Sequence, residues 1–121
     1  ESEFEGVILE STFTNIRAAA IHLTETKISE GDNRFWSHIS TRFVKCYPIT
    51  QTFATDKKIA KIRSPLFIAA SVNDEVIPFH MSEELALENK NAQLYISKEG
   101  NHYSSEWLKP KVLEFLNKIK K

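Results

Sequence analysis

Cysteine is almost absent from this sequence, since Cys46 is the only one among 121 residues. An internal disulfide is therefore excluded, and the composition fits a reducing compartment such as the cytoplasm. Cys46 also lacks a nearby pair of cysteine or histidine residues with the spacing of metal ligands. The sequence accordingly predicts no metal site and no cofactor.

Long apolar runs are missing as well. No stretch approaches the roughly 20 apolar residues of a membrane span, and residues 1–5 lack the basic-then-apolar layout of a signal peptide. Neither sign of charge is in excess, because 16 basic residues balance 16 acidic ones. The sequence therefore predicts one small domain with no membrane partner and no nucleic-acid partner.

Short apolar runs alternate with amphipathic stretches along the chain. Three runs predict buried strands, at residues 6–9, 66–70 and 92–96. Apolar residues at helical spacing predict helices at residues 16–23, 36–47, 81–90 and 108–119. Such alternation is typical of a parallel sheet covered by helices. We therefore predict an α/β fold, a three-stranded parallel half-sheet flanked by helices.

Finer features of these elements also follow from the sequence. Thr12 and Thr14 are candidates to cap the helix after the first strand, and Pro110 is expected in the first turn of the last helix. Residues 49–58 show no clear period, which predicts a loop or short turns.

Two polar loops follow the second and third predicted strands, and they hold Asp74 and His102. In open parallel sheets, ligand sites gather at the carboxyl ends of the strands, so these residues are candidates for a shared site. An acid that holds one imidazole nitrogen fixes the tautomer and leaves the other nitrogen free as a base. Taken singly, Asp74 also fits an ordinary turn residue, and His102 fits a histidine of a surface loop.

Three short segments match one set of motifs in order along the chain. Residues 71–78 read Ser-Val-Asn-Asp-Glu-Val-Ile-Pro, against a usual form of Gly-x-x-Asp-x-x-Val-Pro. Residues 100–102 read Gly-Asn-His, against Gly-x-Gly-His, and residues 10–13 read Glu-Ser-Thr-Phe, against Glu-Ser-Pro-Phe. With these segments the chain resembles the C-terminal half of an α/β-hydrolase superfamily protein, and among its members the BEM46-like serine hydrolases.

The resemblance implies that Asp74 is the triad acid and His102 the general base for hydrolysis of an ester or similar acyl bond. It spans nearly all of the chain but only the second half of the family's fold. The domain expectation is therefore a single C-terminal segment, residues 1–121, with a lid-like helical insertion at about residues 12–58. The residues that depart from the motifs include Thr12, Ser71, Ile77 and Asn101.

Glycine is too scarce to build the family's nucleophile. The elbow needs Gly-x-Ser-x-Gly, with its glycines four residues apart, and the chain has only Gly6, Gly31 and Gly100. The segment that forms the oxyanion hole is absent too. Ser11, at the exit of the first strand, lacks the elbow and is a poor substitute. We expect no hydrolysis from this chain alone, and the alternative function is a non-catalytic binding or assembly module.

The first predicted strand would lie between two neighbours in the complete family fold, and one of them belongs to the absent half. Unpaired backbone groups at such an edge pair readily with another chain. We therefore expect a homo-oligomer through Gly6–Leu9, with Val7 and Leu9 at or near the interface, or a separate N-terminal half as partner. The aromatic residues of segment 34–47 would add further cover.

Overall fold

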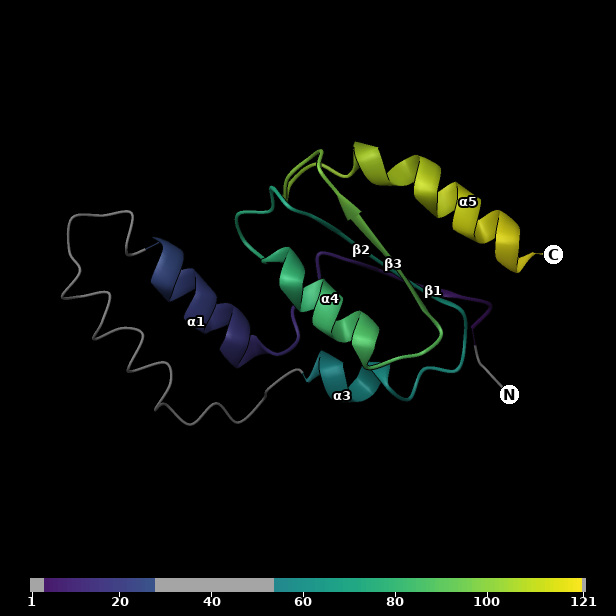
Figure 1. Ribbon diagram of the computed structural model, residues 1–121, viewed down its shortest axis with the longest axis horizontal. Helices are drawn as coiled ribbons and strands as arrows, with labels where there is room; N and C mark the ends of the chain where they lie inside the picture. Colours follow the sequence, from purple (N-terminus) through teal and green to yellow (C-terminus); the bar gives the residue numbers. More distant parts are fainter. Residues whose placement is uncertain (1–3, 28–53, 121) are drawn as a thin grey trace.

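The computed structural model describes residues 4–27 and 54–120. Its elements follow one another as β1 Val7–Glu10, α1 Ile16–Lys27, α3 Thr55–Ile59, β2 Leu66–Ser71, α4 Phe79–Leu87, β3 Ala92–Ser97, the short 3₁₀ helix η1 Glu106–Leu108, and α5 Lys109–Ile119. The strands are parallel, in the order β1–β2–β3. Figure 1 shows α5 on one side of this sheet and α3 and α4 on the other. The predicted half-sheet flanked by helices is confirmed.

One face of the sheet packs against α3 and α4. Leu66 and Ile68 of the central strand β2 lie in one buried cluster with Ile59 of α3 and Leu85 of α4. All six residues of β2 are buried, as expected for a strand covered on both faces. Burying each large apolar side chain contributes about 1.5–3 kcal/mol, so this cluster holds β2 against the two helices.

The other face packs against α5. Phe67 and Ala69, which alternate with the residues above, lie in a second cluster with Leu108 and Phe115. The rings of Phe67 and Phe115 are stacked with their centroids 5.4 Å apart. Pro110 lies in the first turn of α5, as predicted.

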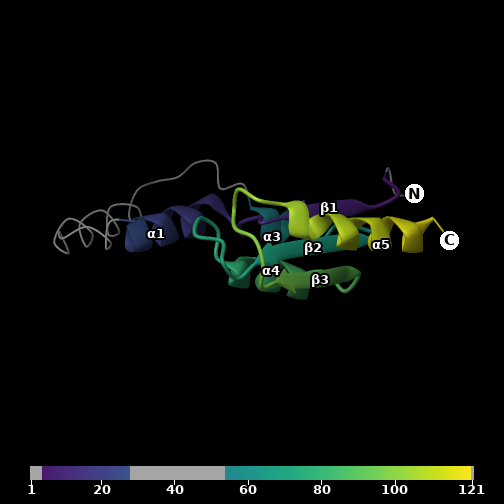
Figure 2. The same cartoon turned by 90° about the horizontal axis from the view of Figure 1, so that it is seen from above.

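The strand β1 forms one edge of the sheet. Among the described residues it pairs only with β2, and Figure 2 shows the three strands side by side in order. The N–H of Val7 donates to the carbonyl of Pro65, just before β2, and the N–H of Ser11 donates to the carbonyl of Ala69 in β2, each at 2.9 Å. Because bonding directions alternate along a strand, the N–H of Ile8 points to the open side.

Two local predictions were wrong. Residues 55–59, expected to be loop or short turns, form the helix α3, which is too short to show a period and is anchored by the buried Ile59. The helix α1 is capped by Asn15 rather than by Thr12 or Thr14, because its Oδ1 accepts the N–H of Ala18 at 2.9 Å.

The predicted helix 36–47 lies outside the described residues, and so does most of the predicted lid-like insertion 12–58. Of that insertion, α1 and α3 are described. Ala19 of α1 packs in a third cluster with Ile77 and Met81, beside the carboxyl ends of the strands. No helix in the described part of the chain has both the length and the apolar character to cross a membrane.

Candidate active site

The candidate site lies where β2 and β3 end. The two strands are paired in register up to Ser71 and Ser97, so the loops that follow leave the sheet side by side. Asp74 comes three residues after the end of β2, and His102 comes five residues after the end of β3. The parallel topology therefore brings both loops to one edge, where open parallel sheets bind their ligands.

Asp74 and His102 are in direct contact. Oδ2 of Asp74 lies 3.0 Å from Nδ1 of His102, within hydrogen-bonding range. The Asp74 side chain is fully buried, whereas 28% of the His102 side chain is exposed. Nε2 of His102 has no hydrogen-bond partner among residues 4–27 and 54–120. The predicted contact is thus present, and it leaves the second ring nitrogen free.

The other carboxylate oxygen of Asp74 is held by its own loop. Oδ1 accepts the N–H groups of Val76 at 2.9 Å and of Ile77 at 2.8 Å. Burial by itself would raise the pKa of Asp74, but the bonds from Ile77, His102, Val76 and Ser11 outweigh it and hold the pKa below its ordinary value. The group facing His102 is therefore a carboxylate, which accepts a hydrogen bond from Nδ1–H.

The loop of His102 is a tight turn shaped by the two residues before it. Gly100 has a φ of 77°, in the left-handed region that glycine tolerates best, and a side chain there would collide with the ring of Trp107. Oδ1 of Asn101 accepts the N–H of Tyr103 at 2.9 Å. Asn101, which departs from the family motif, therefore closes the turn around His102.

Ser11 lies at the same edge of the sheet, directly after β1. Its φ is 47°, a conformation that a serine rarely adopts, and its side chain helps to lower the pKa of Asp74. The sequence marked Ser11 only as a poor substitute nucleophile and gave no sign of this effect on the acid. An attacking hydroxyl needs a contact with the base, and within the described residues Nδ1 of His102 contacts Asp74.

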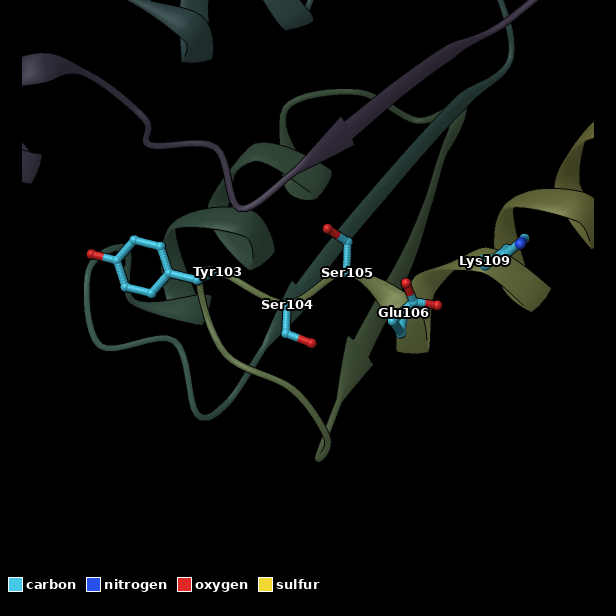
Figure 3. Close-up of a pocket in the computed structure, with 5 residues that line it drawn as sticks. All are labelled: Tyr103, Ser104, Ser105, Glu106 and Lys109. Atoms are coloured by element: carbon cyan, nitrogen blue, oxygen red, sulfur yellow. The ribbon is translucent and has the colours of Figure 1, made fainter.

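A polar hollow of about 340 Å³ follows His102 along the chain. It is lined by Tyr103, Ser104, Ser105, Glu106 and Lys109. Figure 3 shows these residues along the segment that leads into α5, with Tyr103 and Lys109 at the two ends. Ser105 precedes η1, and its side chain makes no capping bond there. The walls of the hollow thus carry hydroxyl groups and charges of both signs.

Within the described ranges, no three histidine, cysteine, aspartate or glutamate side chains gather closely enough to hold a metal ion. The contact between Asp74 and His102 is a carboxylate–imidazole pair. In such a pair the carboxylate orients the ring, and Nε2 can exchange protons.

Comparison with known proteins identifies the fold. No family model and no curated protein matches the chain, but solved structures do. An esterase from Thermogutta terrifontis is 14% identical, with a TM-score of 0.61, and 97% of this chain covers 57% of that one. An α/β fold family hydrolase from Bacillus anthracis is 16% identical, with a TM-score of 0.58, and the shares are 95% and 58%.

A third structure agrees with these two. A protein of Mycobacterium tuberculosis, named as a non-heme bromoperoxidase, is 13% identical with a TM-score of 0.60, and the covered shares are 97% and 59%. The chain thus spans less than two thirds of the length of these structures. At such low identity the likeness concerns the backbone alone, and it is independent of the motifs around Asp74 and His102. This chain has the fold of part of an α/β hydrolase.

Proposed function

We propose that this chain supplies the acid and the general base of a serine hydrolase that cleaves an ester or a similar acyl bond. Asp74 is the acid and His102 is the base. The observation that carries the proposal is the 3.0 Å contact between Oδ2 of Asp74 and Nδ1 of His102, made across two adjacent strand-end loops. The motifs around both residues point to the BEM46-like hydrolases as the nearest kind.

The chemistry follows from the two protonation states of the ring. Asp74 accepts a hydrogen bond from Nδ1–H, which keeps the proton on Nδ1 and leaves the lone pair of Nε2 available to take the proton of an attacking hydroxyl. The imidazolium that forms is stabilised by the buried carboxylate, and it then returns the proton to the leaving group. A lowered pKa of Asp74 suits this role, because the acid must stay ionised while the ring becomes charged.

The nucleophile and the oxyanion hole come from outside these residues. Only three glycines are present and no two of them are four apart, so the chain contains no Gly-x-Ser-x-Gly elbow. The chain also spans only 57–59% of the α/β structures that it matches. We propose that a polypeptide segment placed beside β1 provides the missing groups, either from the same gene or from a separate N-terminal half.

The open edge of β1 is the natural attachment point for that segment. The three strands are parallel and β1 is an edge strand. A further parallel strand paired with β1 would therefore have its carboxyl end on the same side of the sheet as Ser11, Asp74 and His102. A nucleophile carried at the end of that strand would be delivered to the free Nε2. In the absence of the segment, the same edge would join two copies of this chain.

A labelling experiment tests the proposal. The coding sequence upstream of Glu1 is read in frame and the extended protein is expressed and treated with a fluorophosphonate probe, which labels activated serines. We expect one labelled serine, located by mass spectrometry within a Gly-x-Ser-x-Gly segment, and loss of labelling in the His102→Ala variant. An extended protein that lacks such a segment and is not labelled would contradict the proposal and favour a binding or assembly module.

A further inference from the structure

Ser71 occupies a position where the related motif has glycine, and its hydroxyl is fully used. Ser71 closes β2 and is completely buried. Its Oγ donates to the carbonyl of Glu99 at 2.9 Å and to that of Gly100 at 3.1 Å, and it accepts the N–H of Asn73 at 3.1 Å. One O–H is therefore shared between two carbonyls of the neighbouring loop, while a lone pair orders the loop that holds Asp74.

Two further bonds join the same pair of loops. The N–H of Val72 donates to the carbonyl of Ser97 at 2.9 Å, and Nδ2 of Asn73 donates to the carbonyl of Lys98 at 2.8 Å. The three residues that precede Asp74 are thus tied to four consecutive residues, 97–100, that precede His102. Of these links only those of Ser71 and Asn73 use side chains, so only they depend on residue identity.

The contact between acid and base depends on how these loops are placed. Asp74 and His102 lie on separate loops, and a hydrogen bond between them tolerates only a few tenths of an ångström of displacement. A glycine at position 71 could make none of the three bonds of the Ser71 hydroxyl. The carbonyls of Glu99 and Gly100 stand three and two residues before His102, respectively, so a bond to them restrains the base at short range.

We propose that Ser71 is a positioning residue whose hydroxyl, together with the side chain of Asn73, clamps the loop of Asp74 to the loop of His102. The clamp keeps Nδ1–H of His102 aimed at the carboxylate and keeps Nε2 unprotonated for its work as a base. This role rests on the proposed function.

A second buried serine offers a matched control. Ser82 of α4 is as completely buried as Ser71, yet its Oγ has no hydrogen-bond partner within residues 4–27 and 54–120. Replacing either serine by alanine removes one buried hydroxyl from the same small domain. Only the replacement at position 71 removes bonds between the two loops, so any effect common to both variants reflects packing rather than the clamp.

The test reads the tautomer of His102 by ¹⁵N NMR of the histidine rings at alkaline pH, where the imidazole is neutral. The share of the Nδ1–H tautomer reports the bond to Asp74 directly. We expect Ser71→Ala to lower the ratio of the Nδ1–H to the Nε2–H form by roughly two- to tenfold, the factor that corresponds to one ordinary hydrogen bond. Ser82→Ala should leave the ratio at the parent value, and Ser71→Thr, which keeps a hydroxyl, should stay close to it.

A surface variant keeps the test decisive if Ser71→Ala does not fold. Asn73 is exposed, so Asn73→Ala removes only the link to Lys98 and is expected to lower the same ratio by a smaller factor. The proposal would be overturned if the ratio of the two tautomers in Ser71→Ala equalled that in Ser82→Ala. If only Asn73→Ala folds, a ratio equal to that of the parent protein would overturn it.

The tautomer is measured on the chain itself and needs no catalysis. An unchanged ratio therefore overturns the positioning role of Ser71 even when the upstream-extended protein is labelled by the fluorophosphonate probe. A lowered ratio supports the clamp, and a failure of the extended protein to react then counts against the hydrolase assignment alone.

Discussion

Oδ2 of Asp74 faces Nδ1 of His102 at 3.0 Å, while Oδ1 of the same carboxylate is held by the N–H groups of Val76 and Ile77. The two oxygens thus have separate tasks. One fixes the carboxylate within its own loop, and the other reaches across to the next loop. A conservative substitution at position 74 can therefore remove the bond to His102 while keeping the bonds within the loop.

Replacing Asp74 with asparagine should reverse the tautomer of His102. An asparagine oxygen can still accept the N–H groups of Val76 and Ile77, but its NH₂ group would then face Nδ1, which must become an acceptor. We expect the Nε2–H form to dominate in Asp74→Asn at alkaline pH, measured by ¹⁵N NMR. Glu75→Gln, at the exposed neighbouring position, is the matched control, and equal tautomer ratios in all three proteins would contradict the assignment.

The chain alone should be catalytically silent. It has no nucleophile elbow, and within the described residues Nδ1 of His102 contacts Asp74 rather than a serine. We expect no reaction with a fluorophosphonate probe and no hydrolysis of p-nitrophenyl acetate above the level of a His102→Ala control. Stoichiometric labelling of any serine, identified by mass spectrometry and lost in Ser11→Ala, would show that the chain carries its own nucleophile.

Asp74 should stabilise the fold at neutral pH and stop doing so in acid. Its folded-state pKa lies below the ordinary value of 3.8, so the ionised form contributes stability above that value. The contribution is lost as the pH falls through the lowered pKa. We expect the free energy of unfolding, measured in urea, to fall more steeply for the parent than for Asp74→Asn between about pH 5 and pH 2. If the free energies of unfolding of the two proteins changed with pH in parallel, Asp74 would have no electrostatic role in stability.

The open edge of β1 should make the chain self-associate. We expect a dimer or larger species at micromolar concentration, with Val7 and Leu9 at or near the interface. Ile8 lies between them and is 37% exposed, and its backbone N–H points to the open side of β1. Ile8→Pro removes an N–H that β2 does not use, so it should weaken association while leaving the sheet paired. Sedimentation analysis of both proteins checks this, and a stable, well-folded parent monomer would refute it.

The turn before His102 should tolerate no side chain at position 100. Gly100→Ala places a methyl group against the ring of Trp107 and at a φ of 77°, which should lower the free energy of unfolding by about 1–3 kcal/mol. Gly6→Ala is the control, because the atom nearest to its new methyl group is the flexible end of Ile119. Thermal unfolding of both variants measures the difference, and equal losses would show that the turn is not strained.

The sequence predicted the sheet well because buried parallel strands leave a plain signature. Residues 66–70 read as a continuous apolar run, and the strand found is Leu66–Ser71. Asp74 and His102 became candidates from their places after two such runs, together with the motifs around them. The helix α3 was missed, since five residues are too few to show a helical period.

The contacts around the candidate site could not be predicted from the sequence. Ser71 bonds residues 28 and 29 positions away, and no local pattern announces a contact at that separation. Likewise, Ser11 affects the pKa of Asp74 only because β1 and β2 are neighbours in the sheet. Both serines read as ordinary strand-end residues until the topology places them beside the acid.

The central claim is that Asp74 and His102 work as an acid and base pair on a serine delivered from outside these residues. Its most direct test is the kcat/KM for p-nitrophenyl acetate of the upstream-extended protein and of two variants, Asp74→Asn and His102→Ala. The account predicts measurable hydrolysis by the parent and losses of about 10³–10⁴-fold or more in both variants, with folding unchanged by circular dichroism. Hydrolysis that persists at the parent rate in either variant would contradict it.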